Sequence, residues 1–384
     1  MTKNTKILKI AFVLDDGLDK PDGVQQNILT FGSWLRNQGH DVVYLVGKTT
    51  RTDIPGVISL SKNLRVNFNE NRLSMPIISS AKKINQVLKR EKFDVIHVQI
   101  PYSPLMAARL IRRLDKHVTV IGTFHILPSG WASSYGTKLL GRALKYNLKN
   151  FDRQLAVSVP AKIFAKQSFN IDCRVLPNPV DTKRFVPKKT LKKPSGNIKL
   201  LFLGRLVERK GCEHLLQAMQ RMASQYPPKT AWQLDICGDG AMKQKLKKLA
   251  RASGLEKNLS FHGFVSEAEK IKFMRRADVS IFPSTGGESF GIVLIEAMAS
   301  RGGIVLGGNN TGYASVLGSL PESLIDPFDH DAFAKTLSKY IDSKRSRAAL
   351  YQKQQALVGE FDIEVVGPKL LEIYKACIRT KKSR

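Results

Sequence analysis

Short apolar runs recur along the chain, and each is followed by a longer stretch whose apolar positions repeat every three or four residues. Runs of four to eight apolar residues are typical of buried strands, and the longer repeat is typical of amphipathic helices. In the first half the runs are residues 7–14, 41–46, 95–99, 118–124 and 154–158. This alternation predicts a parallel sheet covered by helices.

The alternation restarts after a segment with several lysines and prolines, residues 187–196, which we interpret as a linker. The apolar runs of the second half are residues 198–203, 232–237, 259–262, 279–282 and 303–306. We therefore predict an α/β protein with two Rossmann-like, doubly wound domains, residues 1–188 and 189–362, and a C-terminal segment, residues 363–384. Ligands of such sheets bind at the carboxyl ends of the strands.

The composition is that of an ordinary globular protein, with 42% hydrophobic residues. The apolar run at residues 7–14 is too short for a signal peptide or a membrane-spanning helix. The four cysteines are scattered without C-x-x-C spacing, which predicts reduced thiols and neither a zinc site nor a disulfide framework. These features indicate a cytoplasmic protein.

The net charge of +30 is the most unusual feature of the composition, and it concerns binding partners rather than the fold. The first 190 residues hold 31 Lys and Arg residues against 13 Asp and Glu residues, an excess of +18. Three groups of basic residues lie on predicted helices: Lys82, Lys83, Lys89 and Arg90, beside an apolar stripe of Ile84, Val87 and Leu88; Arg109, Arg112, Arg113 and Lys116; and Lys138, Arg142, Lys145 and Lys149. Such surfaces fit an anionic membrane or a nucleic acid.

The segment with the most candidate chemistry, residues 283–296, follows a predicted buried strand and reads PSTGGESFGIVLIE. Its glycine turn, acid and helix start would aim the backbone N–H groups of Ser289, Phe290, Gly291 and Ile292 at a diphosphate. On a helix, Glu288 and Glu296 would stand about 12 Å apart, so that one could meet a sugar ring and the other a ribose.

This segment resembles the family 4 retaining glycosyltransferases of the GT-B fold, and residues 286–299 are most similar to the phosphatidylinositol mannosyltransferases. The resemblance covers nearly the whole chain. It implies that Glu288 contacts the donor hexose and that Glu296 binds the nucleotide ribose. It also implies that the C-terminal helix crosses back onto the first domain.

Basic residues follow the first strand of the second domain in the segment GRLVERKG, residues 204–211, and Arg205 and Lys210 are the two candidates among them. Cations at a strand end suit the neutralisation of a leaving diphosphate, and the resemblance assigns Arg205 and Lys210 to this role. No D-x-D pair follows a strand in this domain, so we expect neither a metal nor a cofactor. The resemblance places the nucleobase beside Val265, Glu267 and Lys270, with the donor a GDP- or UDP-hexose.

The first domain carries two further candidates. Gly23 and Gln25 open the first predicted helix in a D-G-V-Q sequence similar to the family's G-G-V-Q loop, where a glycine allows close approach to a ligand. His125 ends the fourth strand in a T-F-H sequence, and the matching family histidine contacts the donor sugar and stabilises charge at its anomeric carbon. The residues that follow, 126–130, depart from the family and leave the acceptor open.

The sequence therefore predicts a metal-independent retaining hexosyltransferase that transfers mannose or glucose to a lipid-linked or polyol acceptor such as phosphatidylinositol. It would be cytoplasmic, peripheral on the inner face of the cell membrane. A soluble or polysaccharide acceptor is an alternative. So is a basic nucleic-acid-binding protein, although no recognition motif for nucleic acid accompanies the charge. A dehydrogenase is disfavoured because G-x-G-x-x-G is missing after the first strand, and a phosphorylase because no pyridoxal-phosphate lysine motif is found.

Overall fold

The computed structural model describes residues 6–19, 22–68, 71–101, 103, 105–125, 148–186 and 196–383, apart from the side chains of residues 62–78. By their internal contacts the residues form two compact units. Unit 1 comprises Met1–Pro179 and Ile363–Arg384, and unit 2 comprises Val180–Asp362. The change of unit at Pro179 precedes the predicted boundary at residue 188, and the predicted linker falls almost wholly outside the described residues.

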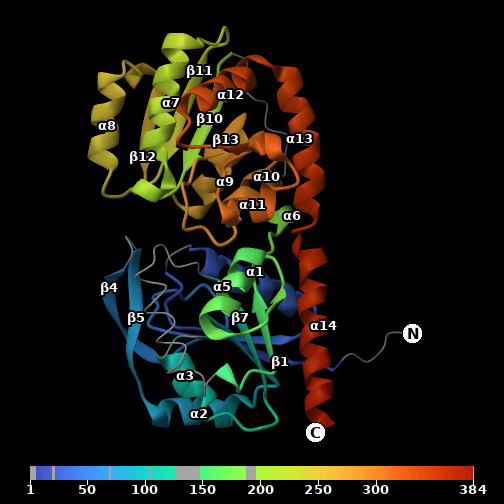
Figure 1. The fold of residues 1–384 in the computed structure, drawn as a ribbon. Coiled ribbons are helices and arrows are strands. Elements are labelled where there is room, and N and C mark those ends of the chain that lie inside the picture. The colour runs from blue at the N-terminus through green and yellow to red at the C-terminus, as the bar shows by residue number, and fades with distance from the viewer. Residues whose placement is uncertain are drawn as a thin grey trace. The chain divides into compact units, whose positions relative to one another are not determined.

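Unit 1 is built on a parallel sheet of seven strands in the order β3-β2-β1-β6-β7-β8-β9. Figure 1 labels two of them, β1 and β7. These strands are β1 (Lys9–Leu14), β2 (Asp41–Val46), β3 (Val57–Ser59), β6 (Val95–Gln99), β7 (Thr119–Phe124), β8 (Arg153–Ala156) and β9 (Arg174–Val175). An antiparallel pair, β4 (Ser61–Phe68) and β5 (Asn71–Ser79), forms a separate small sheet. The described helices of this unit are α1 (Gly23–Asn37), α2 (Ala81–Glu91), α3 (Met106–Ile111), α5 (Val159–Phe169) and α14 (Ile363–Lys382).

Strand β1 shows why both faces of this sheet are covered. Alternate side chains of a strand point to opposite faces, and Ile10 and Phe12 pack in a cluster with α1 and α14. Ala11 and Val13 pack on the other face with side chains of α2 and α3. The sheet is therefore the middle layer of three, as a parallel sheet buried on both faces requires.

Helix α14, at the C-terminal end of the chain, belongs to unit 1. Gly367 of α14 lies so close to α1 that an added Cβ would stand 2.7 Å from the ring of Trp34. Trp34 Nε1 also donates to Glu364 at 2.9 Å, and the Tyr374 hydroxyl lies 2.6 Å from His97 Nδ1 of β6. These contacts hold the helix on the sheet of the first unit.

Unit 2 is built on a parallel sheet of six strands in the order β12-β11-β10-β13-β14-β15. The strands are β10 (Ile198–Leu203), β11 (Trp232–Cys237), β12 (Leu259–Gly263), β13 (Val279–Phe282), β14 (Ile304–Gly308) and β15 (Leu324–Ile325). The helices are α6 (Thr182–Phe185), α7 (Cys212–Gln225), α8 (Lys243–Ala252), α9 (Glu267–Arg276), α10 (Ile292–Ala299), α11 (Thr311–Leu317), α12 (His330–Asp342) and α13 (Lys344–Gly359), with 3-10 turns η1 (Glu208–Lys210), η2 (Glu256–Asn258) and η3 (Pro321–Ser323).

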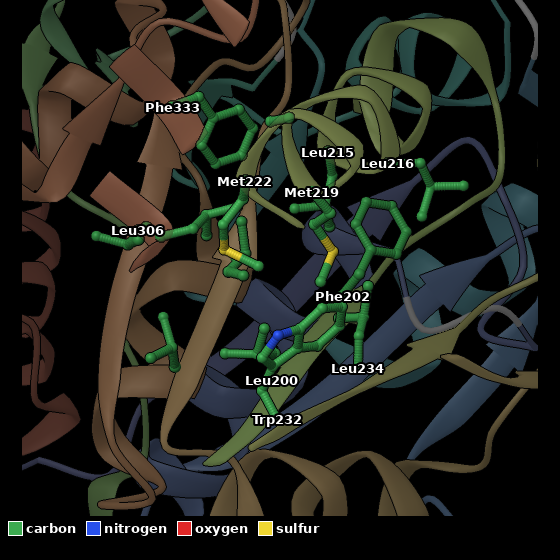
Figure 2. Close-up of a cluster of buried hydrophobic side chains, with 14 of the residues drawn as sticks. Leu200, Phe202, Leu215, Leu216, Met219, Met222, Trp232, Leu234, Leu306 and Phe333 are labelled. Atoms are coloured by element: carbon green, nitrogen blue, oxygen red, sulfur yellow. The ribbon is translucent and has the colours of Figure 1, made fainter. Parts of the chain in front are cut away.

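One large apolar cluster holds α7 and α12 against this sheet. Figure 2 shows Met219 and Met222 of α7 packed with Phe202 of β10 and Phe333 of α12, all of them buried. Trp232, at the start of β11, belongs to the same cluster. Both units are thus α/β units with parallel sheets, which confirms the predicted fold class.

Candidate donor site of unit 2

Two loops that follow neighbouring strands come together at the carboxyl edge of the sheet in unit 2. Strand β10 pairs with β13, so the segments after Leu203 and after Phe282 begin side by side. Gly211 makes the close approach possible, because it has a positive φ of 73° and an added Cβ would stand 1.9 Å from the carbonyl oxygen of Pro283. The two predicted motifs are therefore adjacent in space.

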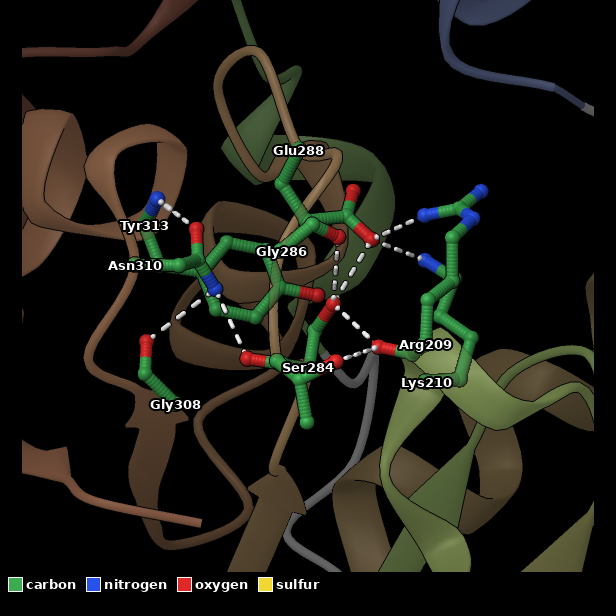
Figure 3. A network of polar contacts seen from close by, with 9 residues as sticks. Arg209, Lys210, Ser284, Gly286, Glu288, Gly308, Asn310 and Tyr313 are labelled. Atoms are coloured by element: carbon green, nitrogen blue, oxygen red, sulfur yellow. Dashed lines mark hydrogen bonds and ion pairs between the residues drawn. The ribbon is translucent and has the colours of Figure 1, made fainter. Parts of the chain in front are cut away.

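The packing of these loops joins Glu288 to two cations (Figure 3). One carboxylate oxygen of Glu288, Oε1, accepts from Lys210 Nζ at 2.7 Å and from Arg209 Nη1 at 2.8 Å. Ser284 Oγ lies 3.1 Å from the same oxygen and donates to the carbonyl of Arg209 at 2.9 Å. We call Glu288, Lys210, Arg209 and Ser284 the Glu288 cluster.

The Glu288 cluster is already charged in this structure. Burial would raise the pKa of Glu288, but the charges of Lys210 and Arg209 outweigh it and hold the pKa below its ordinary value. The side chains of the three residues are only 15%, 19% and 22% exposed, so the ion pairs are partly shielded from water. An ionised carboxylate that accepts hydrogen bonds can bind hydroxyl groups, and the cations beside it can bind phosphate oxygens.

The loop that carries Glu288 is held on its other side by α11. Asn310 Nδ2 donates to the carbonyl of Ser284 at 2.9 Å, while its Oδ1 accepts from the N–H of Tyr313 at 3.0 Å and so caps that helix. Gly312 lies so close that an added Cβ would stand 2.0 Å from the carbonyl oxygen of Glu288. The position of Glu288 is therefore fixed by backbone packing as well as by its ion pairs.

Helix α10 begins directly beyond this loop, at Ile292, after Gly291 with a positive φ of 113°. The expected helical rise between the two acids is wrong, because Glu288 precedes the helix and only Glu296 lies on it. Phe290 is buried against Phe361, with ring centroids 5.6 Å apart, so its side chain serves packing. The first N–H groups of a helix have no acceptor within the helix, so a diphosphate at the N–H groups of Ser289 and Ile292 stays a prediction that this helix start allows.

The second acid is more deeply buried than the first. Both oxygens of Glu296 accept from Lys270 Nζ of α9, at 2.8 and 2.9 Å, and Glu267 stands 3.0 Å from the same nitrogen. Burial would lower the pKa of Lys270, but the two carboxylates outweigh it and raise that pKa. Burial raises the pKa of Glu296 by more than the charge of Lys270 lowers it.

The remaining predicted residues of unit 2 lie on the same edge of the sheet. Arg205 is half-buried just after β10, and Val265 is half-buried just after β12. Phe264, beside Val265, is 73% exposed, which is unusual for a large apolar side chain. The structure thus brings Lys210 to Glu288 and Lys270 to Glu296, and it places Arg205 and Val265 on the adjoining turns.

In unit 1, His125 follows β7 and is buried. Its Nε2 lies 2.6 Å from Oε1 of Gln99, at the end of the neighbouring strand β6. Burial lowers the pKa of His125 to about 3, so the ring is neutral at physiological pH. Gly23 begins α1 as predicted. Gln25 of the same helix is buried, and its Nε2 donates to the carbonyl of Gly17 at 3.2 Å, so its amide is engaged by the loop after β1.

Sequence reasoning missed Arg209, Ser284, Asn310 and Gln99. Arg209 stands next to Lys210 in the motif, but only the turn η1 shows that both side chains reach Glu288. Ser284 and Asn310 donate to the backbone carbonyls of Arg209 and Ser284, and the spacing of residues along the sequence does not reveal such contacts. Gln99 ends an apolar run, and a buried polar residue at a strand end was the signal that could have identified it.

The basic surfaces of unit 1 agree only in part with the prediction. Helix α2 carries Lys82, Lys83, Lys89 and Arg90 as exposed side chains, but the apolar stripe beside them is wrong as a membrane contact: Ile84 and Val87 are buried in the core and Leu88 packs against it. Helix α3 ends at Ile111, so only Arg109 of its group lies on that helix. Lys138, Arg142, Lys145 and residues 126–130 lie outside the described residues.

No helix in the described part of the chain combines the length and apolarity needed to cross a bilayer.

Comparison with known proteins identifies the family. The model "Glycosyltransferase Family 4" matches residues 21–184, and the model "Glycosyl transferases group 1" matches residues 184–356. A phosphatidyl-myo-inositol mannosyltransferase of Mycolicibacterium smegmatis is 28% identical over 96% of this chain and 94% of its own length. A glycogen synthase of Mycobacterium tuberculosis is 23% identical over 94% of this chain and 92% of its own.

Solved structures agree on the fold. A glycosyltransferase from Rickettsia africae superposes with a TM-score of 0.74 at 19% identity, covering 97% of this chain and 99% of that one. HepE from Anabaena, solved with UDP-glucose, superposes with a TM-score of 0.71 at 17% identity over 96% and 100%. The protein is a glycosyltransferase with the GT-B fold. Within that class, the chain belongs to glycosyltransferase family 4.

Proposed function

We propose that this glycosyltransferase moves a hexose, mannose or glucose, from a GDP- or UDP-hexose to a lipid-linked polyol acceptor such as phosphatidylinositol. The observation that carries the donor half of this proposal is the Glu288 cluster at the start of α10. A nucleoside diphosphate and a hexose need cations, helix N–H groups and a carboxylate within a short span, and unit 2 supplies all three there.

Each residue has a distinct part in this proposal. Lys210 and Arg205 neutralise the leaving diphosphate in place of a metal, with Arg209 as a third cation beside Lys210. Glu288 accepts hydrogen bonds from hydroxyls of the hexose, and Glu296 binds the ribose. His125 of unit 1 contacts the hexose as it develops positive charge. The base lies beside Val265 and Lys270.

We further propose that the anomeric configuration is retained. The acceptor hydroxyl then attacks from the face that the diphosphate leaves, and the departing phosphate oxygen takes the hydroxyl proton. Proton NMR of the purified product determines the configuration directly. An inverted anomeric carbon contradicts this part of the proposal.

The acceptor is supported by the full-length similarity to phosphatidyl-myo-inositol mannosyltransferases. Similarity to a glycogen synthase favours a second candidate, transfer to a soluble glucan. The test is a panel of UDP- and GDP-hexoses crossed with phosphatidylinositol vesicles, lipid extracts and glucan, in the presence and absence of EDTA. We expect transfer to lipid that survives EDTA. Transfer to glucan alone supports the second candidate, and nucleic-acid binding without any transfer contradicts both.

The location that we propose is the cytoplasm, with reversible attachment to the anionic inner face of the cell membrane. The exposed cations of α2 would make this contact, because a basic residue near an anionic bilayer contributes about 1 kcal/mol. The α2 variant changes Lys82, Lys83, Lys89 and Arg90 to Gln, and the matched control changes four exposed cations of unit 2, Lys248, Lys257, Lys344 and Arg345. In flotation with anionic vesicles only the α2 variant should lose binding. Equal binding by both variants refutes the role of α2.

A further inference from the structure

Polar side chains interrupt the apolar core of unit 1 where two neighbouring strands end. His97 and Gln99 of β6, and His125 just after β7, are 2%, 0% and 5% exposed. Thr123 pairs with Gln99 across the two strands. Buried polar groups reduce stability unless they are hydrogen-bonded, so the partners of each group restrict what it can do.

The orientation of the Gln99 amide follows from its two neighbours. Its nitrogen lies 3.5 Å from the carbonyl oxygen of His97, and its oxygen lies 2.6 Å from His125 Nε2. The reverse orientation would set the Gln99 carbonyl oxygen against that of His97, which is unfavourable for two acceptors. The group that faces His125 is therefore an acceptor without a hydrogen to donate.

This contact determines where the proton of His125 lies. An amide oxygen can only accept, so His125 Nε2 must carry the hydrogen of the 2.6 Å bond. A neutral imidazole has one N–H, and the ring is neutral because burial lowers its pKa far below 7. The other nitrogen, Nδ1, is then unprotonated and can accept a hydrogen bond from a hydroxyl group.

Gln99 is itself held by a chain of buried contacts within unit 1. His97, whose carbonyl receives the Gln99 amide, lies 2.6 Å from the Tyr374 hydroxyl through Nδ1 and 2.7 Å from Thr123 Oγ1 through Nε2. These bonds tie the end of β6 to α14 and to β7, so the Gln99 amide has a fixed support.

We propose that Gln99 is the positioning residue of His125: it holds the ring in the Nε2–H tautomer, so that Nδ1 is presented as a hydrogen-bond acceptor to a sugar or acceptor hydroxyl. The role of the tautomer in transfer rests on the proposed function, whereas the tautomer itself does not. Gln99 touches no substrate in this account and acts only through His125.

The tautomer is measured on the wild-type protein by nitrogen-15 NMR after selective labelling of the seven histidines. The His125 signals are assigned by their loss in His125→Gln. We expect Nε2 to behave as a protonated, pyrrole-like nitrogen and Nδ1 as an unprotonated, pyridine-like nitrogen at pH 7. A protonated Nδ1, alone or together with Nε2, overturns the proposal whether or not any transfer has been detected.

The positioning role is tested with Gln99→Met, which keeps the volume and removes the amide oxygen. The matched control is Gln154→Met on β8, the other neighbour of β7, where the amide donates to the carbonyl of Leu148. Partners that orient a functional histidine contribute about ten- to a hundredfold in metal sites. We expect kcat of Gln99→Met to fall by this factor, with nucleotide binding unchanged and the Nε2–H tautomer lost.

The outcomes separate the proposal from the proposed function. If the tautomer is lost in Gln99→Met and kcat falls while Gln154→Met keeps both, the proposal is supported. If Gln99→Met keeps the Nε2–H tautomer or the wild-type kcat, the proposal is wrong. If no donor supports transfer but NMR finds the expected tautomer that Gln99→Met loses, the proposed function fails and the assignment of Gln99 to His125 stands.

Discussion

Replacement of Glu288 by Gln should have opposite effects on nucleotide binding and on transfer. In the structure the Glu288 carboxylate accepts hydrogen bonds from Lys210 Nζ at 2.7 Å and from Arg209 Nη1 at 2.8 Å. An incoming diphosphate must compete with the carboxylate for these cations and must also approach its negative charge. The amide of Gln has nearly the same shape and no charge, so it competes less and repels the phosphates less.

The magnitude follows from the hydrogen bonds that change. Lys210 and Arg209 stay charged in this variant, so both bonds remain charge-assisted and only the attraction between opposite charges is lost. An ion pair open to solvent contributes about 0.2–1 kcal/mol, so the loss of this attraction in two pairs whose side chains are 15–22% exposed weakens the competition by about 1 kcal/mol. Since about 1.4 kcal/mol corresponds to tenfold, free GDP or UDP should bind up to about tenfold more tightly. Transfer should fall by about 10² to 10³, as for the loss of other preorganised polar contacts.

The assay is isothermal titration of GDP and UDP, paired with the transfer rate under saturating donor. The matched control is Glu213→Gln on α7, whose carboxylate pairs with the exposed Lys245 outside the Glu288 cluster, and it should leave both quantities unchanged. Weaker nucleotide binding in Glu288→Gln would show that the carboxylate does not compete with phosphate. A wild-type transfer rate would remove Glu288 from the chemistry.

Two further predictions concern stability. Burial lowers the pKa of both His97 and His125 to about 3 in the folded state, against 6.5 in the unfolded state. Between these pH values the unfolded state binds more protons. The free energy of unfolding should therefore fall, as the pH drops below 6.5, by up to about 1.4 kcal/mol per pH unit for each histidine. Burial raises the pKa of Asp15 from 3.8 to about 6, which opposes only part of this loss of stability. The urea midpoint of unfolding should therefore be lower at pH 5 than at pH 7. A higher midpoint at pH 5 would contradict the burial of neutral histidines. Lys270→Met leaves the carboxylate of Glu296 buried without its cation and should cost about 3–5 kcal/mol. The double variant Lys270→Met with Glu296→Leu should recover most of the lost stability. If Lys270→Met alone is as stable as wild type in urea, the pair is not buried in solution.

The sequence predicted the strands of both parallel sheets well because buried parallel strands are continuous apolar runs. It missed β4 and β5, which pair antiparallel and include Lys62, Arg65, Arg72 and Pro76 and therefore have no continuous apolar run. It also missed β3, β9 and β15, which are only two or three residues long and depend on their neighbours in the sheet.

The candidate site was found as two motifs, but their contact was not predictable. Lys210 and Glu288 are 78 positions apart, and they meet because β10 and β13 are neighbours and Gly211 lets one loop approach the other. The prediction that the apolar stripe of Ile84, Val87 and Leu88 contacts a membrane was wrong for a related reason. The pattern at Ile84 and Val87 identifies an apolar helix face, but only the fold shows that this face covers the sheet of unit 1.

The central claim is that unit 2 binds a nucleotide-sugar through the Glu288 cluster and that His125 of unit 1 takes part only in transfer. The most direct measurement compares nucleotide binding and hexose transfer in wild type, Lys210→Ala and His125→Ala, each with the melting temperature as a check on folding. The account predicts that Lys210→Ala loses both binding and transfer, and that His125→Ala loses transfer by about 10² to 10³ while binding GDP or UDP like wild type. Transfer at the wild-type rate in either folded variant would contradict it.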